Sequence, residues 1–475
     1  MNSELSFPAP AHWIDGRPVP ADGPTIDVIN PASDAVIAAV PAGTAADVDR
    51  AVAAATAAFP GWAATAPAER AAIIQRVSDG LRARNEQLAL TITAEMGAPI
   101  TLSRTAQAGL PPVVTAATAG LAADFPWTEQ IGTSLIVREP VGVVGAITPW
   151  NFPLQQLVTK VVPAMLAGNT VVLKPAELAP LSARIFAEVA AEAGLPAGVF
   201  NVVQGTGPVV GEAIASHRGI DLVSFTGSTA TGKRISVLGA QTVKRVALEL
   251  GGKSASVILR DADVPAAVAA SLDSAWVNSG QVCGAYSRLL VPAELRDRVV
   301  ELALAAAAEY SVGDPMREGT RLGPVASQAQ RQRVVSYLER GIAEGATLVT
   351  GGPGPVEGLP GGAYVRPTIF ADVDPDSTIA QEEIFGPVLA IISYTDDDHA
   401  VAIANGTIYG LSGAVFGEDA HAMRIARRMR TGQVWVNGGR MNVLAPFGGY
   451  KQSGNGREMG RFGLEEFLET KAIQL

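Results

Sequence analysis

From residue 141 to residue 250 the chain alternates short apolar runs with helical segments, and this alternation restricts the fold more than any other feature. The runs VGVVGAI, NTVVLK, FNVV and DLVSF read as strands buried on both faces. Segments such as LQQLVTKVVPAML and ARIFAEVAAEA lie between them and have helical character. Strand–helix–strand repetition predicts a parallel sheet, whose ligands bind at the carboxyl ends of the strands. We therefore expect an α/β protein.

The rest of the chain suggests further units, because 475 residues are too many for one core. Residues 251–440 repeat the alternation, with expected strands at SASVIL, SRLLV and QVWVN and helices near 293–309 and 328–344. The first 60 residues read as strands followed by a helix, whose start Thr44 and Asp47 mark as a capping box. A second long helix is expected between Pro67 and Gly97.

Two segments resemble strands that have no partner in either unit, the stretch near 124–140 and the C-terminal EEFLETKAIQL. Unpaired strand edges favour pairing with another chain, so we expect these segments to join subunits.

Composition excludes several classes of function. The formal charge is −10 and no cluster of Lys and Arg occurs, so a nucleic-acid partner is not expected. No apolar run approaches the roughly 18 residues of a membrane span. The first residues lack the basic start and apolar stretch of a secretory signal, and we expect a cytoplasmic protein. The four histidines include no pair at metal-ligand spacing, so no metal site is expected.

Two glycine-rich segments could bind phosphate. The first, Gly205 to Gly211, is one residue too long for the GxGxxG dinucleotide motif. The second follows DLVSF, and its Gly227, Gly232 and Lys233 fit a P-loop, but Arg234 stands where the P-loop needs a hydroxyl. A P-loop nucleotide hydrolase is therefore an alternative, and in either case a helix N-terminus after a strand suits an anion.

Three further segments carry groups that one reaction could use. Cys283, the only cysteine, lies among small residues in VNSGQVCGA; Glu249 lies in LELGGKS; Asn151 lies in PWNFP, between an expected strand and helix. A nucleophile, a carboxylate base and an amide donor are the parts of an acyl-transfer site.

From about residue 12 to the C-terminus these segments resemble the aldehyde dehydrogenase superfamily. The resemblance includes the 34-residue spacing from Glu249 to Cys283, KPAE at 174–177, FTGSTATG at 225–232, EEIFGP at 382–387 and PFGGYKQSGNGRE at 446–458. Trp276 departs from the family pattern, which usually has Phe or a smaller residue there, and bears on the shape of the substrate pocket.

The resemblance implies a fold of two Rossmann-like, doubly wound parallel α/β domains plus a small β element for oligomerisation. Residues 1–121 and 141–250 would bind NAD, and residues 251–445 would form the catalytic domain. Residues 122–140 and 446–475 would form the oligomerisation element of a homodimer or homotetramer.

The resemblance also implies a mechanism that produces a carboxylic acid from an aldehyde. Cys283 would attack the aldehyde, and the Asn151 amide and the Cys283 backbone N–H would stabilise the oxyanion. A thioester would follow, and Glu249 would activate the water that hydrolyses it. A helix dipole, the charge of the bound cofactor and water-mediated proton removal by Glu249 are all open as sources of the thiolate.

NAD is the expected cofactor. Lys174 and Glu177 resemble the pair at the adenosine ribose, and the Glu177 carboxylate would repel a 2′-phosphate, which favours NAD over NADP. Ser228 resembles the pyrophosphate contact, and Glu383 and Phe385 resemble the nicotinamide contacts. The expected set is completed by Thr148, Trp150, Gly207, Gly227 and Gly232.

The substrate itself is not readable from these segments. The aromatic residues Trp150, Trp276 and Tyr286 hint at an apolar or aromatic aldehyde. A non-catalytic relative of the fold is a third alternative, although an abandoned site has no physical need to keep Cys283, Glu249 and Asn151 together.

Overall fold

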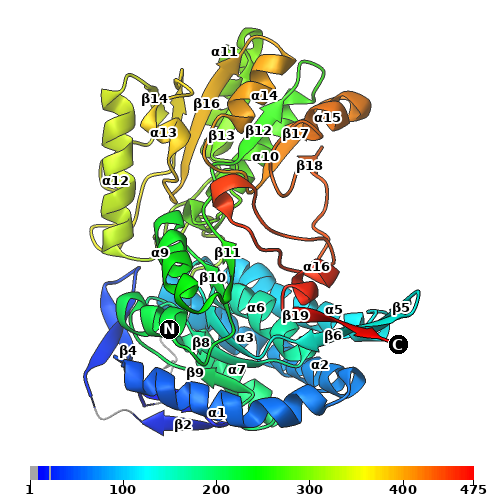
Figure 1. Cartoon of the computed structure of the whole chain (residues 1–475). Helices are drawn as coiled ribbons and strands as arrows, with labels where there is room; N and C mark the ends of the chain where they lie inside the picture. The colour runs from blue at the N-terminus through cyan, green and yellow to red at the C-terminus, as the bar shows by residue number, and fades with distance from the viewer. Residues whose placement is uncertain (1–8, 21–22) are drawn as a thin grey trace.

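The computed structural model describes residues 9–20 and 23–475, so part of the expected N-terminal lead-in lies outside the described residues. Two seven-stranded sheets form the centres of two α/β units, and a three-stranded sheet projects to one side (Figure 1). In Figure 1 the first unit occupies the lower half, in blue to green, and the second occupies the upper half, in green to orange.

The first sheet has the order β11-β10-β7-β8-β9-β1-β2. Its strands are β1 (Ala11–Ile14), β2 (Arg17–Pro20), β7 (Val143–Ile147), β8 (Thr170–Lys174), β9 (Phe200–Val202), β10 (Leu222–Thr226) and β11 (Arg245–Glu249). Strands β7 to β11 are parallel, as the sequence predicts, and β7, β8, β9 and β10 are buried along their whole length. The edge departs from the expected parallel sheet, because β1 pairs antiparallel with both β9 and β2.

Helices cover both faces of this sheet. They include α1 (Ala45–Ala64), α6 (Pro153–Ala167), α7 (Leu181–Glu192), η3 (Gly207–Gly211), α8 (Glu212–Ser216), α9 (Thr229–Gly239) and η4 (Ala240–Thr242). The capping box at the start of α1 is confirmed: the Asp47 N–H donates to Thr44 Oγ1, and the Thr44 N–H donates to Asp47 Oδ2 at 2.7 Å.

The long helix expected between Pro67 and Gly97 is instead two helices, α2 (Pro67–Ala83) and α3 (Asn85–Met96). Arg84 between them has φ −101° and ψ 18°, which is not helical. Its guanidinium pairs with Glu188 and Glu192 of α7, so the break coincides with the place where α3 packs on α7. After α3 come α4 (Ile100–Leu102), η1 (Ser103–Gln107), α5 (Leu110–Gly120) and η2 (Leu121–Ala123).

The second sheet has the order β14-β15-β16-β13-β12-β17-β18. Its strands are β12 (Ala255–Ile258), β13 (Arg288–Pro292), β14 (Thr347–Thr350), β15 (Thr368–Ala371), β16 (Val388–Tyr394), β17 (Gly413–Phe416) and β18 (Trp435–Val436). All pairs are parallel except β14 with β15. The expected strands SASVIL, SRLLV and QVWVN are β12, β13 and β18.

The helices of the second unit are α10 (Val264–Trp276), η5 (Val277–Gly280), η6 (Ala293–Leu295), α11 (Arg296–Ala307), α12 (Gln328–Ala343), α13 (Thr378–Gln381), α14 (Asp397–Asn405) and α15 (Asp419–Ala426). The helices expected near 293–309 and 328–344 correspond to α11 and α12. Near the C-terminus, η7 (Lys451–Ser453) and α16 (Gly460–Glu465) return the chain to the first unit.

The two segments expected to lack partners pair with each other. Strand β19 (Leu468–Gln474) runs antiparallel to β6 (Ser134–Pro140), from Leu468 opposite Pro140 to Gln474 opposite Ser134, and β5 (Thr128–Ile131) covers the other side of β6. Neither segment pairs with a strand of the two seven-stranded sheets, as expected, and residues more than 300 positions apart complete a separate sheet. A separate hairpin of β3 (Thr25–Asn30) and β4 (Ala35–Pro41) lies before α1.

Strand order fixes where a cleft can form. The chain runs from β7 outward to β8 and β9, then returns to the other side of β7 to form β10 and β11, so a topological switch point lies between β7 and β10. A cavity joins the carboxyl ends of these two strands to loops that precede strands of the second sheet. Those loops supply Gly251 before β12, Cys283 before β13 and Glu383 before β16.

Candidate active site

The cavity at the switch point has a volume of about 290 Å³ and brings together residues from both units. Seven of the residues singled out in the sequence line it: Trp150, Asn151, Gly227, Ser228, Cys283, Glu383 and Phe385. The sequence did not single out Gln330 and Arg333 of α12, which also line it. Gln330 Nε2 donates to the Phe385 carbonyl oxygen at 2.8 Å, and Arg333 Nη2 donates to the Glu383 carbonyl oxygen at 2.9 Å.

A tight turn presents Cys283 to the cavity. Asn278, Ser279 and Gly280 all adopt left-handed backbone angles, with φ of 55°, 55° and 73°. A Cβ on Gly280 would lie 2.0 Å from the Gly386 carbonyl oxygen, so this position accepts only glycine. The turn leaves Cys283 half-buried in the loop before β13.

The surroundings of Cys283 favour the protonated thiol. Burial, followed by the carboxylates of Glu383 and Glu249, raises the pKa of the Cys283 thiol to about 12. Cys283 does not itself begin a helix, but the N-terminus of α9 lies at the same cavity. A helix dipole, the charge of a bound cofactor and proton removal by Glu249 therefore all stay open as sources of the thiolate.

Asn151 lies between β7 and α6 and is 3% exposed. Its Nδ2 donates to the Gln281 carbonyl oxygen at 2.9 Å, two residues before Cys283. A carboxamide nitrogen carries two hydrogens, so one N–H is left to donate to an anion in the cavity. An amide N–H fixed in this way is the kind of group that can stabilise an oxyanion.

Glu249 ends β11 and is 4% exposed. Neither of its carboxylate oxygens has a hydrogen-bond partner among the described residues. Burial and the charge of Glu458 raise its pKa well above the usual value, while Lys160 and Arg457 act in the opposite direction. Glu249 itself does not line the cavity, but Leu250 and Gly251, which follow it, do, and the charge of Glu249 contributes to the raised pKa of Cys283.

A buried ion pair beside Glu249 was missed by the sequence reasoning. Lys160 of α6 is 1% exposed, binds the Glu458 carboxylate and donates to Thr226 Oγ1 at 2.5 Å. A signal was present, because a single lysine in the apolar helix LQQLVTKVVPAML must either reach solvent or find a buried partner.

Lys174 and Glu177 lie at the carboxyl end of β8. Lys174 Nζ donates to Glu177 Oε2 at 2.6 Å, and the Gly207 backbone N–H also donates to this carboxylate. Burial disfavours the charge on Glu177, but the Lys174 ammonium and these hydrogen bonds outweigh it and hold the pKa of Glu177 below its usual value. Burial lowers the pKa of Lys174 in turn.

The start of α9 offers backbone donors to an anion. Ser228 is the N-cap, and its Oγ accepts from the Thr231 N–H at 3.3 Å. The other N–H groups of the first turn have no partner within the helix, which makes this end of α9 attractive to phosphate oxygens. Ser228 and Gly227 both line the cavity that contains Cys283.

Aromatic and acidic side chains line the opposite side of the cavity. The rings of Trp150 and Phe385 meet edge to face, with centroids 5.3 Å apart. Glu383 Oε1 accepts from the Gly252 N–H at 3.1 Å, and burial raises the pKa of Glu383 to about 7. Thr148 is buried and its N–H donates to the Lys174 carbonyl oxygen at 3.1 Å.

Comparison with known proteins shows the family to which the chain belongs. The model of the aldehyde dehydrogenase family matches residues 19–473. The chain belongs to this family.

Individual relatives agree along the whole chain. A 3-succinoylsemialdehyde-pyridine dehydrogenase from a Pseudomonas species is 48% identical over 466 residues, which cover 97% of each protein. A crystal structure of aldehyde dehydrogenase C from Pseudomonas syringae, a variant in complex with NAD⁺ and octanal, has a TM-score of 0.98 at 49% identity and covers 100% of this chain and 99% of that one. Betaine aldehyde dehydrogenase from Staphylococcus aureus with NAD⁺ has a TM-score of 0.94 at 39% identity, covering 98% and 95%.

The protein is therefore an NAD-dependent aldehyde dehydrogenase, which oxidises an aldehyde to a carboxylic acid. The alternative of a P-loop nucleotide hydrolase was wrong. Arg234, which replaces the metal-binding hydroxyl of a P-loop, forms a bidentate pair with Glu212, at 2.9 and 2.8 Å.

Two of the residues that the sequence singled out, Gly232 and Trp276, are buried and contribute to the packing of this dehydrogenase. Gly232 is buried against β11, and a Cβ there would lie 2.6 Å from Leu250 Cδ2, so its small size allows α9 to approach the sheet. Trp276 is fully buried at the end of α10, stacks edge to face on Tyr310 and does not line the cavity. The hint that Trp276 shapes the substrate pocket was therefore wrong.

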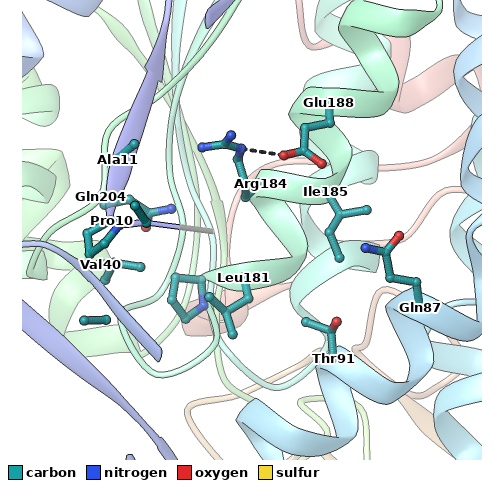
Figure 2. A pocket seen from close by; sticks show the side chains of 13 residues that line it. Pro10, Ala11, Val40, Gln87, Thr91, Leu181, Arg184, Ile185, Glu188 and Gln204 are labelled. Atoms are coloured by element: carbon teal, nitrogen blue, oxygen red, sulfur yellow. Dashed lines mark hydrogen bonds and ion pairs between the residues drawn. The ribbon is translucent and has the colours of Figure 1, made fainter. Parts of the chain in front are cut away.

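The described chain has other cavities besides this one. A second cavity, of about 80 Å³, lies between α3, α7 and the N-terminal strands, with Arg184 and Glu188 paired on its wall (Figure 2). Among residues 9–20 and 23–475, no group of three or more His, Cys, Asp or Glu side chains is arranged to hold a metal ion. Within those residues, no helix is both long and apolar enough to cross a membrane.

Proposed function

We propose that Cys283, Asn151 and Glu249 carry the reaction of this aldehyde dehydrogenase and that its substrate is an apolar or aromatic aldehyde. The observation that carries the proposal is one cavity lined by Cys283 and Asn151 together with Ser228 and Glu383. It joins a nucleophile and an amide donor to the groups that suit a dinucleotide, and it is also lined by Leu250 and Gly251, which directly follow Glu249.

The Cys283 sulfur attacks the aldehyde carbon and forms a thiohemiacetal. The free N–H of the Asn151 carboxamide and the Cys283 backbone N–H donate to the oxygen on which negative charge develops. Each such donor contributes on the order of 100- to 1000-fold to the rate, because its position is fixed before the charge appears.

The residues at the carboxyl ends of β8 and β10 fit NAD. Ser228 and the start of α9 suit the pyrophosphate, and Glu383 suits a ribose hydroxyl. Bound NAD supplies the hydride acceptor, by which the thiohemiacetal on Cys283 becomes a thioester. The crossed rings of Trp150 and Phe385 shape the cavity wall beside Cys283.

Glu249 then removes a proton from the water that hydrolyses the thioester, and the carboxylic acid leaves. Both of its oxygens are buried and have no protein hydrogen-bond partner, so both acceptor positions are unused among the described residues. Its raised pKa increases its strength as a base once it is ionised, which matches it to this step.

The ionised Glu177 carboxylate supports a preference for NAD over NADP. Its pKa is held low by Lys174, so it stays charged and would repel the 2′-phosphate of NADP. Lys174, Glu177 and Gly207 form one hydrogen-bonded group, which suits recognition of the adenosine ribose.

The substrate class rests on the relatives. One is named for a semialdehyde that carries a pyridine, and another was crystallised with octanal. Of the residues that line the cavity, Arg333 alone is cationic, and its Nη2 donates to the Glu383 carbonyl oxygen; the rest of the wall carries no positive charge for a carboxylate-bearing aldehyde.

We further propose a homodimer or homotetramer. Both outer edges of the three-stranded sheet, β5 and β19, are exposed and unpaired within the described chain. The three larger sheets support the division into an NAD-binding domain, a catalytic domain and an oligomerisation element, and this division stays a prediction. The cytoplasmic location also stays a prediction.

The test is NADH formation over aliphatic, aromatic and carboxylate-bearing aldehydes, with NAD and NADP in parallel. Octanal and a pyridine-bearing aldehyde should be oxidised faster than a short carboxylate-bearing one. Cys283→Ala should form no NADH while it still binds NAD. Normal turnover by Cys283→Ala would refute the assignment.

A further inference from the structure

Four buried carboxamide side chains form one hydrogen-bonded group beside Cys283, which we name the carboxamide cluster: Gln107, Asn151, Asn278 and Gln281. None is more than 3% exposed. Gln107 Nε2 and Asn278 Nδ2 each donate to the Asn151 backbone oxygen at 2.9 Å. Asn151 Nδ2 donates to the Gln281 backbone oxygen at 2.9 Å, and Gln281 Nε2 donates to the Asn278 backbone oxygen at 2.9 Å.

The two donors to Asn151 come from opposite sides of the cleft. Gln107 ends η1 in the first unit, and Asn278 belongs to the turn that precedes Cys283 in the second unit. Together they occupy both lone pairs of the Asn151 backbone oxygen. The backbone of Asn151 is thereby held against the segment that carries the nucleophile.

The carboxamide cluster is costly to stability. Gln107 Oε1 and Asn278 Oδ1 are buried and have no hydrogen-bond partner among the described residues. Burying an unpaired acceptor is unfavourable, and an apolar side chain of similar length at position 107 would avoid that cost. Asn278 also adopts a left-handed backbone with φ of 55°. These features indicate that the donors serve a purpose other than stability.

We propose that Gln107 and Asn278 are positioning residues, which hold Asn151 so that its free N–H meets the oxyanion that forms on the substrate of Cys283. The inference rests on the proposed role of Asn151. Since oxyanion donors act through fixed geometry, loss of either support should slow the reaction and leave NAD binding unchanged.

The test is a double-mutant cycle on the rate of NADH formation, with Gln107→Met, Asn151→Ala and the double variant. Methionine keeps the length of the side chain and removes the donor. We expect Gln107→Met to lower kcat and kcat/KM together, roughly 10- to 100-fold, because the lost interaction acts in the transition state. In the Asn151→Ala background the same substitution should change kcat less than about 2-fold, since the residue it positions is gone.

The outcomes separate this inference from the proposed function. If Asn151→Ala retains the full rate, the role of Asn151 fails and the positioning role fails with it. If Asn151→Ala is slow but Gln107→Met causes the same fold-loss in both backgrounds, Asn151 keeps its role and the positioning role is overturned. A wild-type rate for Gln107→Met also overturns it.

Asn278→Asp provides the second variant if Gln107→Met does not fold. Aspartate tolerates the left-handed backbone and keeps the shape of the side chain, but its carboxylate cannot donate to the Asn151 oxygen. It should show the same loss of kcat and the same dependence on Asn151; equal losses in both backgrounds count against the inference. The matched control is Gln204→Leu, which removes another buried glutamine with an unpaired oxygen, outside the carboxamide cluster, and should leave kcat near that of the wild type.

Discussion

Glu249 and Gly454 form an isolated antiparallel bridge, so the carboxyl end of β11 is held by the C-terminal segment of the chain. Gly454 has φ of +127°, and a Cβ there would lie 2.0 Å from the Leu248 carbonyl oxygen. The same loop gives Leu250 its backbone partner, the Ser453 carbonyl oxygen at 2.9 Å. The proposed base is thus positioned by residues about 200 positions away in the sequence.

We expect Gly454→Ala to destabilise the protein and to slow thioester hydrolysis, because the added Cβ must push the loop away from β11. Overpacking of this kind costs roughly 1–3 kcal/mol. Thermal unfolding and steady-state turnover measure the two effects. Gly120→Ala is the control, since nothing lies within 4 Å of a Cβ at that position. Equal behaviour of the two variants would contradict this description of the bridge.

Alkylation of the single cysteine should be slow at neutral pH in the cofactor-free protein. Burial and the nearby carboxylates raise the pKa of Cys283 to about 12, so the thiolate fraction grows about tenfold for each pH unit over the accessible range. The rate at which iodoacetamide alkylates Cys283, measured at about five pH values between pH 6 and pH 10, would test this dependence. A plateau near pH 8 would show that the free protein already holds a thiolate.

Glu177→Gln should weaken discrimination against NADP. The substitution removes the charge that repels the 2′-phosphate and keeps the hydrogen-bonding shape, so the ratio of kcat/KM for NADP to that for NAD should rise about tenfold, equivalent to about 1.4 kcal/mol. Glu192→Gln, which removes an exposed carboxylate paired with Arg84 on α7, is the control. An unchanged ratio in Glu177→Gln would show that the charge of Glu177 does not determine the preference for NAD over NADP.

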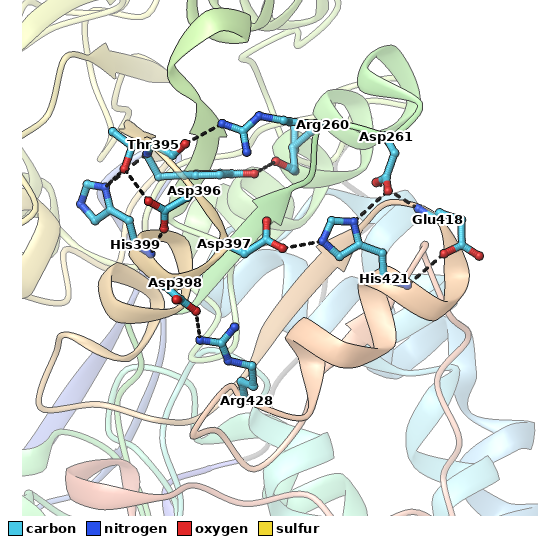
Figure 3. A network of polar contacts seen from close by, with 12 residues as sticks. Arg260, Asp261, Thr395, Asp396, Asp397, Asp398, His399, Glu418, His421 and Arg428 are labelled. Carbon is cyan, nitrogen blue, oxygen red and sulfur yellow. Dashed lines mark hydrogen bonds and ion pairs between the residues drawn. The ribbon is translucent and has the colours of Figure 1, made fainter.

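A histidine at the carboxyl ends of the strands of the second sheet, the edge opposite the one near the cavity, should make the stability of the protein depend on pH. Figure 3 shows His421 between two carboxylates: Nδ1 lies 2.8 Å from Asp261 Oδ2, and Nε2 lies 2.7 Å from Asp397 Oδ2. These hydrogen bonds raise the pKa of His421 above 6.5. A raised pKa in the folded state gives stability that is fully present below the unfolded pKa and is lost as pH rises through the folded value.

The difference in Tm between the wild type and His421→Gln should therefore be largest below about pH 6 and should shrink as pH rises. Thermal unfolding at several pH values measures it. His217→Gln, which removes a histidine paired with Asp49 alone, is the control. A difference that grows with pH would have the wrong sign for this ion pair.

The sequence predicted what depends on local patterns. The apolar runs predicted β7, β8, β9 and β10 of the first sheet and β12, β13 and β18 of the second. The motifs around Cys283, Asn151 and Glu383 identified residues that one cavity brings together. The prediction of a capping box at Thr44 was confirmed for the same reason, since the motif involves residues only three positions apart.

The sequence could not predict what depends on distant contacts. The pairing of β6 with β19 joins residues more than 300 positions apart, and the break at Arg84 coincides with contacts to α7. The positions of Gln107 and Lys160 depend on partners that are 44 and 298 positions away in the sequence. Trp276 was misjudged because nearness to Cys283 in the sequence does not place a side chain in the cavity; Trp276 packs against Tyr310 instead.

The central claim is that a thioester forms on Cys283 and that Glu249 releases it. The most direct measurement is the intact mass of Glu249→Gln after brief exposure to octanal and NAD, together with the NADH formed in the first turnover. We expect about one NADH per chain, then stalling, with an added octanoyl group on the only cysteine in the sequence. Continued turnover at the wild-type rate, or an acyl group on another residue, would contradict the account.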